Sequence, residues 1–208
     1  MPGNTTRLVI VAGIGASGTS AIAGALHAMG VPMGHEAHMG THPAGFSLYE
    51  DAEFYGVFQR GDRGEIKQVV LRHAHPPVFG FKNTLAFKCL HWLPAYLDDI
   101  GWDTRIIACH RIAMASALGR EEGRCPPGTY YSKEDAQRWV VQALHEYTGA
   151  LLSTDAPIYH VQYEWLLNDP AEEIEQLARF VFDGLDVPVD LDAGIGLVAS
   201  AHNNRRGK

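Results

Sequence analysis

Four short apolar runs recur along the chain, and each is rich in β-branched or aromatic residues. They cover residues 8–12, 79–82, 105–109 and 158–162. Runs of this length are typical of buried strands, and the helical patterns between them favour parallel pairing, because crossover helices then join successive strands. The pattern therefore predicts an α/β fold of three layers, with a central parallel sheet flanked by helices.

Apolar residues at helical spacing predict helices between these strands. The first is expected over residues 21–29, a second over 49–59 and a third over 85–98. Two other segments, 34–47 and 119–131, follow neither period and contain glycine and proline. Long ordered loops on such a sheet are often substrate lids, so these two segments are candidates for contact with a substrate.

Capping residues mark the start of two later helices. Ser132 precedes a long amphipathic segment whose first turn is acidic, which suits an N-cap. Asp169 is followed by Pro170 at the first helical position, and Glu172 stands where it would complete a capping box. These signals predict helices that begin directly after Ser132 and Asp169.

Composition narrows the class of protein. With 208 residues and 46% hydrophobic content, the chain can form one domain, residues 1–208, with a sizeable core. The net charge of -7 argues against non-specific nucleic-acid binding. The three cysteines, Cys89, Cys109 and Cys125, form no disulfide or metal pattern, which indicates a reducing cytoplasm. No signal peptide or membrane-spanning segment is found, so no membrane partner is expected.

The segment 13–20 reads GIGASGTS and joins the first predicted strand to the first predicted helix. Such a loop points backbone N–H groups into a concavity at a helix N-terminus, which is a ready site for a phosphate or sulfate group. Gly13 and Gly18 have the spacing of a nucleotide-hydrolysing P-loop, but Thr19 stands where its lysine is expected. The plainer alternative is that the glycines only form a tight turn. The loop predicts a P-loop-like fold that binds a nucleotide-like anion without that lysine.

Separated segments over most of the chain resemble the sulfotransferases that use 3′-phosphoadenosine-5′-phosphosulfate (PAPS), especially the compact bacterial and carbohydrate-type members. The segments are GASGTS at 15–20, HPAGFSLYED at 42–51, FGFKN at 79–83, RIIACHR at 105–111 with ASAL at 115–118, and YEWLLNDP at 163–170. The resemblance implies that PAPS is the cofactor. It also implies that a sulfuryl group moves to a hydroxyl or amine of a small-molecule or carbohydrate acceptor.

The resemblance also assigns residues to the two ends of the cofactor. The 5′-phosphosulfate would be bound by the loop residues Gly15, Ala16, Ser17, Gly18, Thr19 and Ser20. Arg111 and Ser116 would hold the 3′-phosphate. Arg111 also ends a predicted strand, where a bidentate grip on a phosphate is possible. The alternative is an ordinary arginine paired with a carboxylate.

Two further residues are the candidates for catalysis. Lys82 follows a predicted strand at the edge where ligands bind in open α/β sheets, so it is the candidate cation at the reacting centre. Its alternative is a solvated lysine. Glu50 is the candidate base, because burial could raise its basicity. The alternative is that Glu50 and Asp51 cap a nearby helix.

The sequence departs from the family pattern at several positions. Ala16 stands where the family usually has Arg or Lys, and residues 112–113 are Ile-Ala instead of Asp-Pro. The family serine eight residues after its arginine falls on Gly119, so Ser116 fits only with a short gap. Thr84 occupies the place of the catalytic histidine of the small-molecule branch. These departures leave the identity of the base open.

Two other functions compete with sulfuryl transfer. A nucleotide or small-molecule kinase would need the lysine that Thr19 replaces and carboxylates for magnesium. A non-catalytic nucleotide-binding protein would explain Ala16 and Thr84. His35, His38 and His42 lie at helix-like offsets, but neighbouring Gly and Pro break any helix there, so no metal site is predicted and an acid or base on a lid loop is the stronger interpretation.

Overall fold

The computed structural model has the α/β architecture that the sequence predicts. Four parallel strands pair in the order β4-β1-β5-β6. They are β1 (Arg7–Gly13), β4 (Val78–Lys82), β5 (Asp103–His110) and β6 (Ile158–Gln162), so all four predicted strands are confirmed. The structure describes residues 6–34, 39–41, 47–113, 115–116 and 132–206, without the side chains of 39–41, 47–48 and 201–206.

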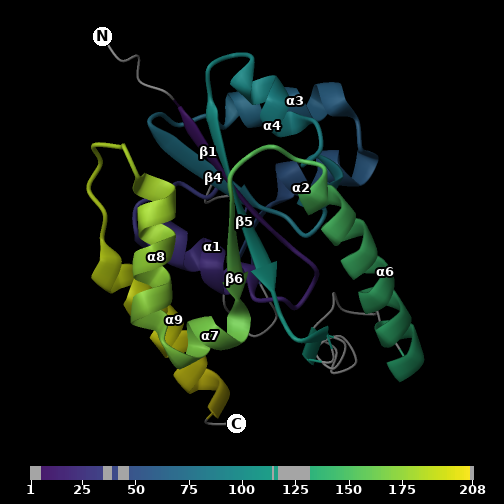
Figure 1. Cartoon of the computed structure of the whole chain (residues 1–208), viewed down its shortest axis with the longest axis vertical. Coiled ribbons are helices and arrows are strands. Elements are labelled where there is room, and N and C mark those ends of the chain that lie inside the picture. Colours follow the sequence, from purple (N-terminus) through teal and green to yellow (C-terminus); the bar gives the residue numbers. More distant parts are fainter. Residues whose placement is uncertain (1–5, 35–38, 42–46, 114, 117–131, 207–208) are drawn as a thin grey trace.

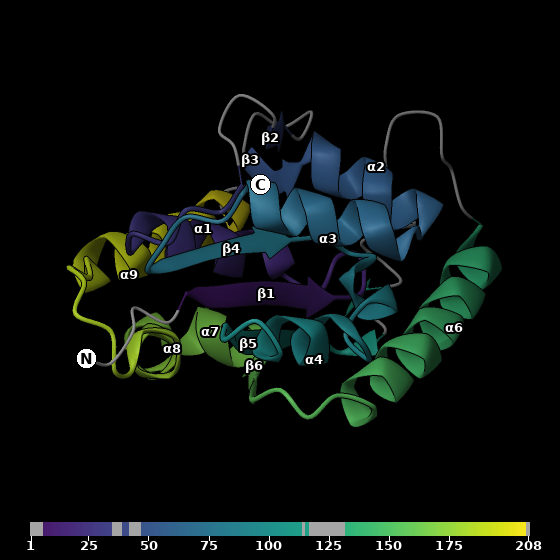
Figure 2. The same ribbon diagram turned by 90° about the horizontal axis from the view of Figure 1, so that it is seen from above.

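Side chains of the sheet alternate between two apolar cores, which is why the sheet is covered on both faces. In β1, Leu8, Ile10 and Ala12 belong to one core, and Val9 and Val11 to the other. The first core is covered by α2 (Ala52–Arg60), α3 (Arg63–Arg72), α4 (Leu93–Asp98) and α6 (Lys133–Leu152). The second is covered by α1 (Thr19–Ala28), α7 (Tyr163–Asn168), α8 (Pro170–Phe182) and α9 (Leu191–Arg206). Figures 1 and 2 show these two groups of helices on opposite sides of the sheet.

The segment predicted as a helix over 49–59 is a strand followed by a helix. β3 (Ser47–Asp51) pairs antiparallel with β2 (Met39–Thr41), and α2 begins only at Ala52. Asp51 has an extended backbone and its side chain accepts a hydrogen bond from Glu53 N at 2.8 Å. An N-cap has non-helical backbone angles, so the helix cannot extend back through Tyr49.

The single helix predicted over 85–98 is two short pieces. A 3-10 turn, η2 (Ala86–Lys88), is followed by α4, which begins at Leu93. Pro94 has no N–H and would break a helix that started at 85. In α4 it lies in the first turn, where no N–H is required.

The predicted caps are correct except for one detail. Ser132 accepts a hydrogen bond from Asp135 N, and Asp169 accepts one from Glu172 N at 3.2 Å. The Glu172 side chain does not complete a capping box, because it accepts from Gln176 instead. The N–H of Asp169 is already bonded to Trp165 O at 2.9 Å. The backbone N–H of Asp169 is therefore bonded to a carbonyl of the preceding helix α7, and not to the Glu172 side chain as it would be in a capping box.

A buried arginine, Arg7, connects several segments at the amino edge of the sheet, where the strands begin. Arg7 donates to the Asp103 carboxylate at 2.7 Å and to the backbone carbonyls of Val181 and Asp183. Arg105 adds bonds to Asp103 and to the Phe180 carbonyl. These bonds attach the end of α8 to the first and third strands of the sheet.

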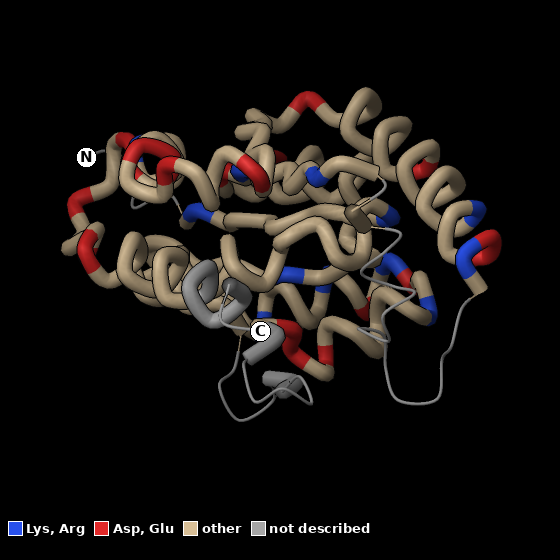
Figure 3. The backbone as a smooth tube through the Cα atoms, turned by 90° about the horizontal axis from the view of Figure 1, so that it is seen from below, with Lys and Arg blue, Asp and Glu red and all other residues tan. Residues whose placement is uncertain are grey.

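Figure 3 marks the positions of the acidic and basic residues along the described backbone, and both kinds occur on α2, α3 and α6. In the part of the chain that the structure describes, no helix combines the length and the apolar character needed to cross a bilayer.

Candidate functional site

The loop between β1 and α1 has a backbone that only small residues accommodate readily. Ala16 and Gly18 both have positive φ, 67° and 94°. A Cβ atom added at Gly18 would lie 2.2 Å from the ring of Tyr163, so a larger residue would overlap that ring. No side chain caps α1 at Gly18. The strand-loop-helix connection is therefore as predicted, and the N-terminus of α1 lies at the carboxyl edge of the sheet, where the strands end.

Two serines of the predicted site have buried hydroxyl groups. Ser17 is 1% exposed and Ser116 is fully buried. Neither Oγ atom has a hydrogen-bond partner among the described residues. Buried hydroxyl groups in proteins nearly always have a hydrogen-bond partner. The hydroxyl groups of Ser17 and Ser116 are therefore available for a hydrogen bond to a ligand. Ser17 lies inside the loop, and Ser116 lies five residues after Arg111.

Arg111 connects the end of β5 to the loop. Its Nη1 donates to the carbonyl oxygen of Ala16 at 2.9 Å. Its guanidinium lies over the Tyr163 ring, 5.3 Å from the ring centroid, and its Nε is 3.9 Å from Glu164 Oε1. Glu164 in turn accepts from Ile112 N. The cation is thus held beside the loop by an aromatic ring, a carbonyl and a carboxylate.

Tyr163 belongs to the family-like segment 163–170, but the sequence assigns it no role. The structure places its ring against both Gly18 and Arg111. The Tyr-Glu pair at the end of β6 therefore supports the loop and its cation together.

Lys82 is buried instead of solvated. Its side chain is 4% exposed, and its Nζ is 3.3 Å from Glu50 Oε1. Burial lowers the pKa of the Lys82 ammonium below its usual value, while the Glu50 carboxylate acts in the opposite direction. Lys82 pairs with Val11 in the sheet register, two residues before the end of β1. The lysine therefore lies at the carboxyl edge, as expected.

The side chains of Glu50 and Asp51 have different partners and different roles in the structure. Asp51 caps α2, as the plainer alternative proposed. Glu50 does not cap the helix; its Oε1 pairs with Lys82 and accepts from Thr84 N at 3.2 Å. Within the described residues, Glu50 Oε2 makes no hydrogen bond. Thr84, which stands in the place of the family histidine, thus contributes its backbone N–H to this group.

Two histidines that the sequence did not single out meet at the same edge. His110 Nε2 and His160 Nδ1 are 2.8 Å apart. The 5.1 Å between the ring centroids is about the sum of that distance and the two ring radii, so the nitrogens face each other in an N–H···N bond. Burial and the neighbouring His160 lower the pKa of His110. Fifty positions separate the two residues, and only the pairing of β5 with β6 brings them together.

Several predicted features lie outside the described residues. They are the histidines His35, His38 and His42, most of the segment 34–47, and the whole segment 119–131 with Gly119 and Cys125. Among the residues that the structure describes, no group of three or more His, Cys, Asp or Glu side chains is placed to hold a metal ion.

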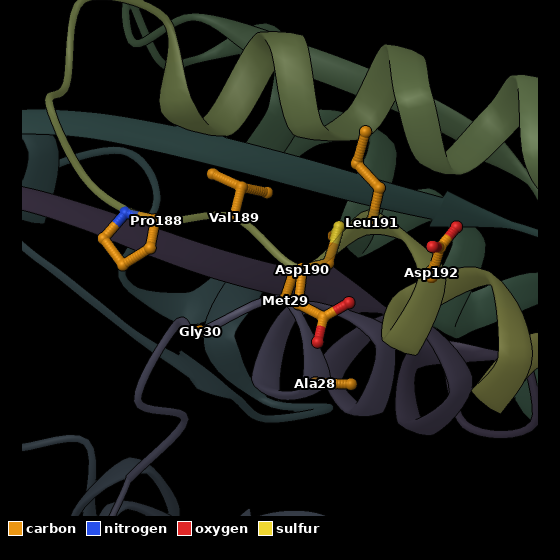
Figure 4. A pocket seen from close by; sticks show the side chains of 8 residues that line it. All are labelled: Ala28, Met29, Gly30, Pro188, Val189, Asp190, Leu191 and Asp192. Carbon is orange, nitrogen blue, oxygen red and sulfur yellow. The ribbon is translucent and has the colours of Figure 1, made fainter.

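A surface hollow of about 600 Å³ lies away from these residues. It is lined by the end of α1 and by the segment before α9, including Met29, Gly30 and Asp190 (Figure 4). The loop joins α1 at its other end. The hollow therefore contains none of the predicted site residues and is not the candidate site.

Among the solved structures that match this chain is a sulfotransferase. The crystal structure of sulfotransferase STF1 from Mycobacterium tuberculosis H37Rv matches with a TM-score of 0.59, covering 95% of this chain and 72% of that chain. The chain has a sulfotransferase-like fold. The identity is 14%, so the likeness concerns the fold alone. No protein-family model matches the sequence, and no curated protein matches it.

Proposed function

We propose that this chain binds PAPS at the carboxyl edge of the sheet and transfers its sulfuryl group to a hydroxyl or amine acceptor. The observation that carries the proposal is the bond from Arg111 to Ala16, which holds a cation beside the loop that we propose binds the anion. The acceptor is proposed to be a small molecule or carbohydrate, and the compartment the cytoplasm.

The residues present fit a phosphorylated, sulfated nucleotide. The buried hydroxyls of Ser17 and Ser116 have no partner among the described residues, and an oxygen of such a ligand would supply one. The N–H groups at the start of α1 and the helix dipole favour a negative charge in the same place. Arg111 offers the planar donor set that phosphate recognition uses.

When bound, PAPS supplies an activated sulfuryl group. Lys82 would neutralise the negative charge that develops on the bridging oxygen as the sulfur–oxygen bond to the phosphate breaks. Glu50 would take the proton of the acceptor as the new bond forms between sulfur and the acceptor oxygen or nitrogen. Because Glu50 Oε1 already pairs with Lys82, the proton would go to Oε2. The ion pair would also hold the lysine and the carboxylate in fixed positions.

One observation favours a second candidate, a nucleotide-binding protein without transferase activity. Each of the two cations at the site lies near a carboxylate, Lys82 at 3.3 Å from Glu50 and Arg111 at 3.9 Å from Glu164. A site with compensated charges stabilises a developing negative charge less. PAPS binding without transfer to any of a broad panel of hydroxyl and amine acceptors would favour this candidate.

Calorimetry with 3′-phosphoadenosine-5′-phosphate (PAP), AMP and ATP tests the binding step. PAP should bind at least about tenfold more tightly than AMP, because a charge-assisted contact with Arg111 contributes about 1.5–3 kcal/mol. Arg111→Ala should remove that difference. Arg138→Ala is the matched control, since Arg138 lies on the exposed face of α6. Equal affinities for PAP and AMP in the unaltered protein would contradict the proposal.

A further inference from the structure

Asn83 carries a buried amide group whose donor is unused. The residue is fully buried. Its Oδ1 accepts a hydrogen bond from Leu85 N at 2.7 Å, which fixes which end of the amide is the oxygen. Its Nδ2 has no hydrogen-bond partner among the described residues. A buried NH₂ group without a partner is rare in proteins and requires an explanation.

The position of Asn83 relates this donor to the candidate site. Asn83 directly follows Lys82, and its backbone N–H reaches Val11 O of β1 at 3.4 Å. Its other neighbour along the chain, Thr84, donates to Glu50. Asn83 therefore lies at the carboxyl edge, bonded through its backbone to β1, which leads into the loop, and next in sequence to Lys82 of the ion pair.

A neutral donor suits this particular site. The family position for a loop cation is occupied by Ala16, and Lys82 is already paired with a carboxylate. Additional amide and hydroxyl donors would stabilise an anionic oxygen without a further positive charge. Ser17 and Ser116 share the property of Asn83, because each has a buried polar atom without a described partner.

We propose that Asn83 is an additional ligand-binding residue of this site, whose Nδ2 donates to an oxygen of the 5′-phosphate of the nucleotide. The inference rests on the proposed function and adds a residue to it. The hydrogen bond from Leu85 N fixes the orientation of the amide before the ligand binds. The donor then needs no reorganisation on binding.

The experiment measures PAP affinity and thermal stability for two variants. In Asn83→Ser the hydroxyl can still accept from Leu85 N, as in a serine turn, but the NH₂ group is gone. Asn83→Ala removes both the NH₂ donor and the oxygen that accepts from Leu85 N. Its melting temperature, compared with that of Asn83→Ser, shows how much the hydrogen bond to Leu85 N contributes to stability. Both variants should bind PAP about tenfold more weakly, which corresponds to roughly 1.4 kcal/mol. The melting temperature of Asn83→Ser should stay at or above that of the unaltered protein.

Two controls separate the possible outcomes. Ser17→Ala should also lose affinity, whereas Thr104→Val should not, although Thr104 Oγ1 is likewise buried and without a described partner, because it lies at the amino edge. If Ser17→Ala loses affinity and both Asn83 variants bind PAP normally, the role of Asn83 is overturned and the proposed function stands. If the unaltered protein does not bind PAP, the proposed function fails and the Asn83 role fails with it.

A measurement on the unaltered protein decides the matter if the variants do not fold. The side-chain NH₂ resonances of Asn83 should shift downfield and exchange more slowly with water when PAP is added. Resonances that remain unchanged at saturating PAP would overturn the proposal.

Discussion

The two edges of the central sheet differ in how the side chains of their buried polar residues are hydrogen-bonded. At the amino edge, Arg7 bonds to Asp103 and to the carbonyls of Val181 and Asp183. At the carboxyl edge, Ser17, Asn83 and Ser116 keep buried polar atoms without a described partner. Arg7 and its partners complete their own bonds and attach α8 to the sheet. At the carboxyl edge we propose that a ligand takes up the unbonded donors, and Thr104, whose Oγ1 is likewise without a described partner at the amino edge, provides the comparison that tests this.

The first prediction concerns the carboxyl edge and has the largest expected effect. Lys82→Met should lower the rate of sulfuryl transfer by about 10²–10³-fold, the usual loss when one group that stabilises the transition state is removed. The rate should be measured with PAPS and an acceptor found by screening. Circular dichroism should show an intact fold, and the double variant Lys82→Met/Glu50→Gln avoids leaving Glu50 unpaired. Undiminished transfer in Lys82→Met would place the catalytic cation elsewhere.

A substitution at the amino edge should lower the stability of the protein and leave its ligand binding unchanged. Arg7→Ala should lower the free energy of unfolding by about 3–5 kcal/mol, because it leaves Asp103 and two buried carbonyls without their donor. Urea titration measures this loss. The molecules that remain folded should bind PAP normally. Arg138→Ala again serves as control, with a change below about 0.5 kcal/mol expected for an exposed pair.

A third comparison sets the serines against Thr104. Ser17→Ala and Ser116→Ala should each lower PAP affinity by about tenfold while stability without ligand stays equal or rises by up to roughly 1 kcal/mol, because an unsatisfied hydroxyl is removed. Thr104→Val should raise stability alone. Parallel changes in affinity and stability in all three variants would remove the distinction between the two edges.

The smallest predicted effect is a pH dependence from His110. Its pKa in the folded protein is below the ordinary 6.5, so the unfolded chain binds a proton first as the pH falls. Stability should therefore decrease from about pH 7 as the pH passes through 6.5, and level off below the folded pKa. His110→Gln should reduce this decrease in urea titrations at pH 7 and pH 5.5. An identical decrease in the variant would assign it to other groups.

The sequence predicted the sheet well because β1, β4 and most of β5 are apolar runs with buried side chains on both faces. In the edge strand β6 only Val161 is buried, but Ile158 and Tyr159 still favour a strand. The loop was predicted equally well, since glycine spacing after a strand is a local signal. Helix α3 was missed although the sequence carries its signal: Ile66, Val69 and Val70 have helical spacing, and Asp62 caps the helix. Residues 49–51 were predicted as part of a helix but belong to β3. Their pairing with β2 determines this conformation, and the local sequence does not reveal that pairing.

The site was predicted only in part. Lys82 and Glu50 were named separately, but their 3.3 Å separation depends on how β3 packs beside β4. The bond from Arg111 to Ala16 joins residues 95 positions apart. Asn83 received no role, because a sequence does not reveal which buried donor lacks a partner. The roles of all these residues, and the single domain over 1–208, remain predictions.

The bond between Arg111 and Ala16 makes the ends of β5 and β1 thermodynamically linked. A ligand that draws the guanidinium away from the Ala16 carbonyl changes the loop at the same time, and Ala16 already has the unfavourable φ of 67°. By reciprocity, a group that tightens the loop must alter the affinity for an anion at Arg111 by the same factor. The two phosphates of the proposed nucleotide would then be coupled through a contact within the protein, so the affinity for PAP should differ from the product of the affinities for fragments that carry one phosphate each.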